Sequence, residues 1–311
     1  MENENLQEQM GQEQIGQEGQ FTPPPPPPAP RASGVKTAVA VFGTIGGYMA
    51  LNGLIRLLFG HVIKLKTDND YQLQFLGAIP VFVFLAVMLY MVLGKKKTVR
   101  MKGNGFFKGL LVGAYLIVIG IINFLSGMFI TVNEQGLPVY GMQEGAHFGS
   151  LQVWCIAALI LSAGICEELM FRGIILNALR DFFGRDTYKG TVLAIFISGV
   201  MFGCIHFVNL WAGVTLQNVL VQVVSVTGMG FYFGAVYCRS GNIKVTMFIH
   251  ALVDICILIP QTMKSQSGDL GQSLNNSINP AAYFSIITYT VITLILLRKS
   301  VRGQLFTYTV E

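Results

Sequence analysis

The sequence predicts an all-α membrane protein, a bundle of eight transmembrane helices. Composition, a series of apolar segments and the placement of basic residues all predict it. The 311 residues are 52% hydrophobic and 12% charged, with a mean hydropathy of +0.56, whereas a soluble domain is about 25% charged. Segments that cross lipid should be helices, because their backbone must satisfy its own hydrogen bonds.

Eight apolar segments follow the N-terminal region, and most approach the ~20 residues needed to cross a hydrocarbon core. We expect one spanning helix from each, within a transmembrane domain of residues 35–303 whose motif-bearing core is 150–262. The segments cover roughly 36–60, 73–93, 106–130, 150–171, 190–208, 216–238, 244–262 and 281–298.

The first 34 residues differ from the rest of the chain. The stretch "MENENLQEQMGQEQIGQEGQ" is rich in Gln and Glu, and "PPPPPPAP" follows it closely. A segment this poor in apolar side chains cannot bury enough surface to fold, so we expect residues 1–34 to be a disordered tail. Proline-rich segments also bind proline-recognition domains, which leaves an unidentified partner of the tail as an alternative.

Basic residues predict the orientation, because loops rich in Lys and Arg stay in the cytoplasm. The loop "GKKKTVRMK" (94–102) is strongly basic, whereas loops 131–149 and 209–215 contain no Lys or Arg. Eight segments counted from that basic loop place both termini in the cytoplasm. They also place "ICEELMFRG" (165–173) at the cytoplasmic end of the fourth segment. The net charge of +5 thus reflects membrane orientation, and we expect no nucleic-acid partner.

Few ionisable residues lie inside the apolar segments. A charged side chain at the bilayer centre costs about 2.5–3.5 kcal/mol on insertion, so such residues usually face the bundle interior and mark a functional site. The candidates for such a site lie in or directly beside the fourth, fifth and seventh segments. They are Glu167, Glu168, Arg172, His206, His250 and Asp254.

The spacing of these residues predicts shared helix faces. Glu168 and Arg172 are four residues apart and can form an ion pair. In the fifth segment, Gly199 and Gly203 form a GxxxG pair, which favours a close approach between helices. The same four-residue spacing recurs in Phe202 with His206 and in His250 with Asp254.

Together these side chains have what hydrolysis by water requires. A carboxylate can take the proton from water, one imidazole can orient the water, and a second imidazole with Asp254 can stabilise the oxyanion. Two other interpretations fit the same residue types. Glu and His could hold zinc with a water in an open position, or they could relay protons in a coupled transporter.

The three motifs, in this order and on separate segments, resemble those of the type II CAAX prenyl endopeptidases and their bacterial relatives, the Abi or CPBP intramembrane proteases. The family pattern is EExxxR, then FxxxH, then HxxxN or HxxxD. Here "EELMFR" begins at Glu167, "FGCIH" ends at His206, and "HALVD" begins at His250. The resemblance covers roughly residues 150–262, and "EELMFRG" is close to the form common in bacterial members.

The resemblance implies an eight-helix bundle, in the plasma membrane of a bacterium, with a catalytic cavity open toward the cytoplasm. It implies an endopeptidase whose partners are the lipid bilayer and a membrane-associated peptide or protein substrate. Glu167 would activate water with the help of His206. His250 and Asp254 would hold the oxyanion, Glu168 and Arg172 would support the site structurally, and Phe202 would shape it.

One position departs from the pattern. Asp254 stands where the eukaryotic prenyl proteases have Asn, and an ionised Asp cannot donate a hydrogen bond to an oxyanion. Either Asp254 is protonated, or it orients His250 as the acid of a serine-protease triad does. The third alternative is an altered activity, with the chain acting as a membrane binding or immunity module.

Metal dependence is open at this level. The chain has no HExxH motif, and the candidate ligands lie on three segments. We therefore prefer a glutamate mechanism without a cofactor, and zinc is the alternative.

Overall fold

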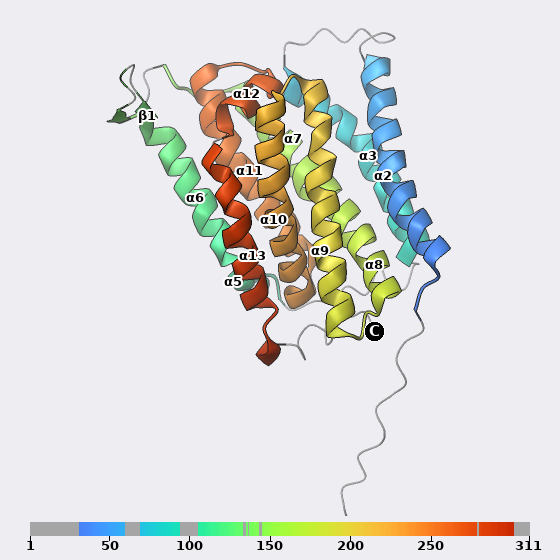
Figure 1. The fold of residues 1–311 in the computed structure, drawn as a ribbon. Helices are drawn as coiled ribbons and strands as arrows, with labels where there is room; N and C mark the ends of the chain where they lie inside the picture. The colour runs from blue at the N-terminus through green and yellow to red at the C-terminus, as the bar shows by residue number, and fades with distance from the viewer. Residues whose placement is uncertain are drawn as a thin grey trace, which may run out of the picture. The chain divides into compact units, whose positions relative to one another are not determined.

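Each apolar segment predicted from the sequence corresponds to a helix or to a pair of bent helices in the computed structural model (Figure 1). Of residues 1–34, the structure describes only 31–34, and these belong to the same compact unit as the helix bundle. The prediction that residues 1–34 form a separate region therefore lies almost wholly outside the described residues. The structure describes residues 31–59, 69–93, 105–132, 135, 137–142, 145–278 and 280–301.

The predicted polytopic all-α bundle is confirmed. Six spans are long and apolar enough to cross a membrane, and the number rises to eight when each of two bent helix pairs counts as one span. The six are α2 (Gly34–Leu57), α3 (Asp70–Leu93), the continuous span Ser150–Phe183, α9 (Tyr188–Cys204) with the 3-10 helix Ile205–Ala212, α10 (Leu216–Ser240) and α11 (Ile243–Ser265).

The two bent pairs complete the bundle. Helices α5 (Phe106–Val112) and α6 (Ala114–Phe129) meet at 74° around Gly113, and α12 (Leu270–Ser277) meets the helix ending in α13 (Ser285–Leu296) at 77°. An added Cβ at Gly113 would overlap the Ile249 side chain of α11, so this glycine allows the close approach. The remaining elements are the 3-10 helices Pro280–Phe284 and Lys299–Val301, and an antiparallel hairpin of β1 (Ile130–Val132) and β2 (Pro138–Tyr140).

The fourth span is longer than the apolar segment 150–171 that predicted it. It runs without a break through α7 (Ser150–Leu159), two π-helical segments (Ile160–Glu167 and Leu169–Ile175) and α8 (Leu176–Phe183). The helix continues for about three further turns beyond residue 171, so Glu167 lies near its middle. That the glutamates lie at the cytoplasmic side of the membrane stays a prediction.

Helices α9 and α10 pack side by side through glycines, as the GxxxG pair predicts (Figure 1). An added Cβ at Gly199 would overlap the Phe231 ring, and one at Gly203 would overlap the Thr227 hydroxyl. From the opposite side, a Cβ at Gly230 would lie 2.8 Å from the Gly199 Cα. The absence of side chains on both surfaces therefore brings the two backbones into close contact.

Replacement of Gly203 tests this packing. We expect Gly203→Ala to destabilise the protein by about 1–3 kcal/mol, as overpacking a filled interior does, because the added methyl group meets both the Thr227 side chain and the Val223 carbonyl oxygen. Thermal unfolding in detergent measures it. The matched control is Gly53→Ala in α2, where an added Cβ has nothing within 4 Å. Equal melting temperatures for the two variants would contradict the close α9–α10 contact.

Candidate functional site

The π-helical part of the fourth span carries the EExxxR motif. Glu167 ends the first π-helical segment, Glu168 separates the two, and Arg172 lies in the second. π-Helical turns are rare and often occur at functional sites. The winding places the two glutamates on different sides of the helix and gives them different surroundings.

Glu168 is fully buried and contacts two partners through one oxygen. Its Oε1 lies 3.0 Å from Nη1 of Arg172, the ion pair that the spacing predicts, and 2.9 Å from Nδ1 of His250 on α11. Both partners are buried as well. A carboxylate removed from water in this way needs close partners of opposite charge or hydrogen-bond donors. Glu168 therefore joins the fourth span to the seventh.

A glycine brings these two helices close enough for that contact. An added Cβ at Gly164, one turn before Glu168, would lie 2.8 Å from the Ala251 Cβ and 2.9 Å from the Met247 carbonyl oxygen. Ala251 directly follows His250 in α11. The missing side chain at Gly164 thus places His250 within reach of Glu168.

His250 has carboxylates at both ring nitrogens. Because a carboxylate only accepts, Nδ1 donates to Glu168, whereas Nε2 lies 3.9 Å from Oε2 of Glu167 and 3.6 Å from Oδ2 of Asp254. The ring is 2% exposed, and the side chains of Glu167 and Asp254 are 21% and 25% exposed. Nε2 therefore points to the more accessible side of the cluster.

The sequence left open whether Asp254 orients His250 as a triad acid does. In the structure, Glu168 forms the hydrogen bond to Nδ1, and Asp254 lies near Nε2. Asp254 thus faces the same side of the imidazole as Glu167. Sequence spacing could not have indicated that Glu168 is the acid on Nδ1, because the two residues are 82 positions apart.

Glu167 differs from its neighbour in accessibility, because its side chain is 21% exposed and that of Glu168 is 0%. Oε2 of each glutamate is buried and has no hydrogen-bond partner among the described residues. Oε2 of Glu167 lies 3.9 Å from Nε2 of His250, which exceeds a direct hydrogen bond. Glu167 is therefore the more accessible carboxylate of the pair.

His206 stands in the 3-10 turn that follows α9. Its Nδ1 lies 2.9 Å from the Phe202 carbonyl oxygen. Since a carbonyl only accepts, Nδ1 carries the hydrogen, and in the neutral ring the lone pair is then on Nε2. The imidazole is thus fixed in the tautomer that can accept a hydrogen bond from water.

The Phe202 ring lies at the centre of the constellation. It is fully buried, and its centroid is 5.4 Å from the His206 ring and 5.6 Å from the His250 ring, both edge-to-face. The guanidinium carbon of Arg172 lies 4.3 Å from the same centroid. Phe202 therefore contacts members of all three motifs. The seven predicted side chains therefore lie together around Phe202 and His250. His206 contacts Phe202, and Phe202 in turn contacts His250, which lies beside the three carboxylates.

Two aromatic residues outside the motifs also belong to this cluster. Phe233 of α10 lies against His250 and Arg172, and Phe171 packs edge-to-face on Phe202 with centroids 4.9 Å apart. Sequence reasoning missed both, because a phenylalanine inside an apolar segment is indistinguishable from ordinary core packing.

The side chains present do not fit the zinc alternative. Within the described ranges, no three His, Cys, Asp or Glu side chains are grouped in a way that could hold a metal ion. His250 pairs with carboxylates instead, and Nδ1 of His206 donates to the Phe202 carbonyl oxygen.

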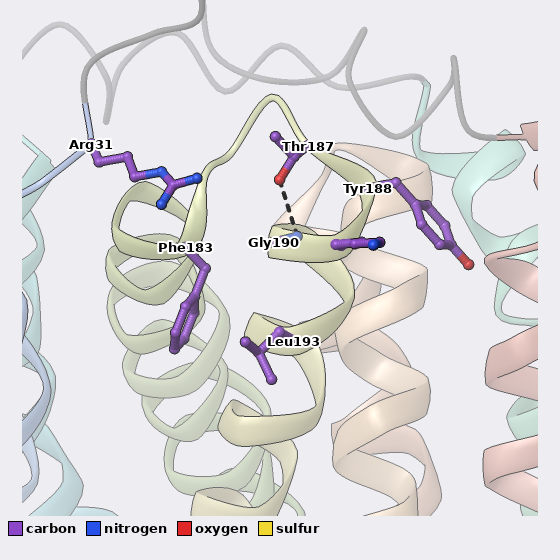
Figure 2. A pocket seen from close by; sticks show the side chains of 7 residues that line it. Arg31, Phe183, Thr187, Tyr188, Gly190 and Leu193 are labelled. Atoms are coloured by element: carbon purple, nitrogen blue, oxygen red, sulfur yellow. Dashed lines mark hydrogen bonds between the residues drawn. The ribbon is translucent and has the colours of Figure 1, made fainter.

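A separate cavity of about 510 Å³ lies where α8 turns into α9 (Figure 2). Thr187 caps α9 there by accepting a hydrogen bond from the Gly190 amide at 3.1 Å. This cavity contains none of the predicted site residues and is not the carboxylate–imidazole cluster. Its lining consists of Arg31, Phe183, Thr187, Tyr188, Lys189, Gly190 and Leu193.

The fold and the site define an integral membrane protein with a cluster of carboxylates and imidazoles enclosed between its helices. Residues 149–256 match the family of Type II CAAX prenyl endopeptidase Rce1-like proteins, so the resemblance expected from the motifs is confirmed over the segment that holds all three. The chain is also similar to "Putative membrane peptidase YdiL" of Bacillus subtilis (strain 168). The two are 27% identical over 221 residues, which cover 65% of this chain and 79% of that relative. Together the comparisons support a membrane protease.

The buried ion pair can be tested by its effect on stability. We expect Arg172→Met to destabilise the protein by about 3–5 kcal/mol, because it leaves the Glu168 carboxylate buried without its cation. The double variant Glu168→Gln/Arg172→Met should recover part of that loss, because it removes both charges. Reversible unfolding in mixed micelles provides the free energies.

The control is the other four-residue pair, Asp181 with Arg185, whose side chains are 27% and 12% exposed. There, Asp181→Asn should change the unfolding free energy by no more than about 1 kcal/mol, as for pairs near the surface. A double variant at residues 168 and 172 less stable than Arg172→Met alone would show that the two charges do not compensate each other.

Proposed function

We propose that this protein is an intramembrane endopeptidase that hydrolyses a peptide bond of a membrane-associated peptide or protein. The observation that carries the proposal is the gap of 3.9 Å between Oε2 of Glu167 and Nε2 of His250. One acid with a free oxygen faces one oriented imidazole there, on the exposed side of an otherwise buried cluster. The match to membrane peptidases supports the same reaction class.

Glu167 acts as the general base. It takes a proton from a water molecule whose oxygen forms the new bond to the scissile carbonyl carbon, and it later gives that proton to the leaving amine as the C–N bond breaks. His206 assists, because its Nε2 is free to accept a hydrogen bond from the same water. Adjacent Glu168 is less suited to this part, since its side chain is fully buried and its Oε1 contacts both Arg172 and His250.

His250 stabilises the oxyanion together with Asp254. In its protonated form the imidazole donates from both nitrogens: Nδ1 to Glu168, and Nε2 toward the developing negative charge. The Glu168 carboxylate on Nδ1 offsets the charge of the imidazolium. Asp254 lies next to Nε2 and contributes, in its protonated form, a second hydrogen-bond donor to the oxyanion. It is not needed to orient His250, because Glu168 already binds Nδ1.

The same proposal includes the location and orientation of the protein. The bundle lies in the plasma membrane of a bacterium with both termini in the cytoplasm, and the substrate reaches the cluster from the cytoplasmic side. The reaction needs no cofactor. Prenylation of the substrate is not part of the proposal, since fold similarity does not transfer specificity.

Replacing Glu167 tests the reaction. We expect Glu167→Gln to abolish peptide cleavage, because an amide cannot accept the proton, while folding and expression persist. Comparative membrane peptidomics of cells with wild-type protein and with Glu167→Gln identifies the substrate as a peptide that only the former produces. Purified protein should cleave that peptide equally well with and without a metal chelator.

Asp181→Asn is the matched control for Glu167→Gln, with the same chemical change outside the cluster, and it should cleave like wild type. Wild-type turnover by Glu167→Gln would refute the endopeptidase. If that variant also keeps the cellular phenotype, the chain is a binding or immunity module. Proton uptake that depends on a transported solute would identify a transporter.

Asp254 distinguishes hydrogen-bond donation from orientation of His250. Because Glu168 already holds Nδ1, we expect Asp254→Asn to keep activity within about tenfold of wild type, whereas Asp254→Ala, which cannot donate, loses about 100-fold or more, as for an oxyanion donor. Steady-state kinetics on the identified peptide measures both. Equal losses in the two variants would mean that the charge of Asp254 matters and its donor capacity does not.

A further inference from the structure

Phe233 packs against two site residues, although α10 carries none of the predicted motifs. Its ring centroid lies 5.2 Å from that of His250, with the planes inclined at 38°, and 5.0 Å from the guanidinium carbon of Arg172. The side chain is completely buried. Phe233 therefore reaches the cluster from a fourth helix and does so without access to solvent or substrate.

The Arg172 guanidinium lies against two aromatic rings, those of Phe202 at 4.3 Å and Phe233 at 5.0 Å. Its Nη1 is 3.0 Å from Oε1 of Glu168 as an ion pair, and neither Nη1 nor Nη2 has a hydrogen-bond partner among the described residues. The faces of aromatic rings attract cations, and more strongly where water is excluded. The two rings thus provide favourable contact for the part of the guanidinium that hydrogen bonds leave unsatisfied.

The same two rings limit the motion of the His250 imidazole. One hydrogen bond, from Nδ1 to Glu168, fixes a single atom of the ring and leaves rotation about that contact. Phe233 lies against the imidazole at 38°, and Phe202 meets it edge-to-face at 83°. Contacts from two directions hold the plane of the ring, so Nε2 keeps its direction toward Glu167 and Asp254.

We infer that Phe233 is a positioning residue of the site, which holds the His250 imidazole and the Arg172 guanidinium in their working arrangement. The inference rests on the proposed peptidase function, in which the direction of Nε2 sets the rate of the chemical step. The charged and titratable groups around His250 are Glu167, Glu168 and Arg172 on the fourth span, Asp254 on its own helix and, across Phe202, His206.

Kinetics of Phe233→Leu test the inference against a matched control. Phe231 lies two residues away on α10, is 7% exposed, and packs its ring on Phe196 with centroids 4.5 Å apart. We expect Phe233→Leu to lower kcat about 10- to 100-fold, the range that a small misplacement of a catalytic group produces, with KM within about twofold. Phe231→Leu should keep the wild-type kcat. Equal kcat values for the two leucine variants would overturn the inference.

A series of fluorinated phenylalanines at position 233 distinguishes the electrostatic effect of the ring face from the effect of simple packing. Fluorine withdraws electron density from the face of the ring while nearly preserving its shape. We expect kcat to fall stepwise from phenylalanine through 4-fluoro- to 3,4,5-trifluorophenylalanine, with a small stepwise drop in melting temperature as the contact with Arg172 weakens. A constant kcat across the series would show that the ring acts on the site by volume alone, and the stated role toward Arg172 would be refuted.

A measurement that does not depend on catalysis tests this inference independently of the proposed function. The chain has four histidines, so the ring resonances of His250 can be assigned by NMR of ¹³C-histidine-labelled protein with His250→Gln. Phe233→Leu should shift the His250 ring signals, and Phe231→Leu should leave them in place. If Glu167→Gln still cleaves, the proposed function fails and the His250 signals alone decide on Phe233. If only the site assignment of Phe233 is wrong, Glu167→Gln is inactive and both leucine variants behave alike.

Discussion

The contact of one carboxylate oxygen with a guanidinium and an imidazole is the interaction on which the rest of the site depends. Oε1 of Glu168 meets Arg172 on its own helix and His250 on α11, and all three side chains are buried. Any one of them alone would be a costly charge in the bilayer interior. Together, Glu168 and Arg172 neutralise each other, and Glu168 joins the fourth span to the seventh. The oxygen that makes the buried arginine tolerable is therefore also the one that anchors His250.

Small residues decide how close the helices come, and large rings then fill the space around the charges. Gly164 lets the fourth span approach α11, and Gly199 does the same between α9 and α10. Closely packed backbones allow rings from two different helices, those of Phe202 and Phe233, to lie against one guanidinium. The dry surroundings of the ion pair are therefore a product of glycine positions that carry no chemistry of their own.

The sequence predicted what depends on local pattern, and it missed what depends on contacts between distant segments. Apolar length predicted the spans, and the four-residue spacing predicted the Glu168–Arg172 pair. The fourth helix extends past the apolar segment 150–171 because Arg172, which ends that segment by composition, has a buried partner and lies inside the bundle. The contact between Glu168 and His250 has no local signature, since spacing along the chain does not specify which acid meets an imidazole on another helix.

The two adjacent glutamates have different roles, one structural and one chemical, because a helix points neighbouring residues in different directions. A single carboxylate could not both neutralise Arg172 and accept a proton from water, since protonation would remove the charge that holds the buried guanidinium. With two in succession, Glu168 faces Arg172 and His250 and keeps its charge, while Glu167 faces Nε2 of the same imidazole with an unpaired oxygen. One helical turn thus supplies a fixed anion and a titratable base within reach of one ring, an arrangement in which a proton can move without loosening the bundle.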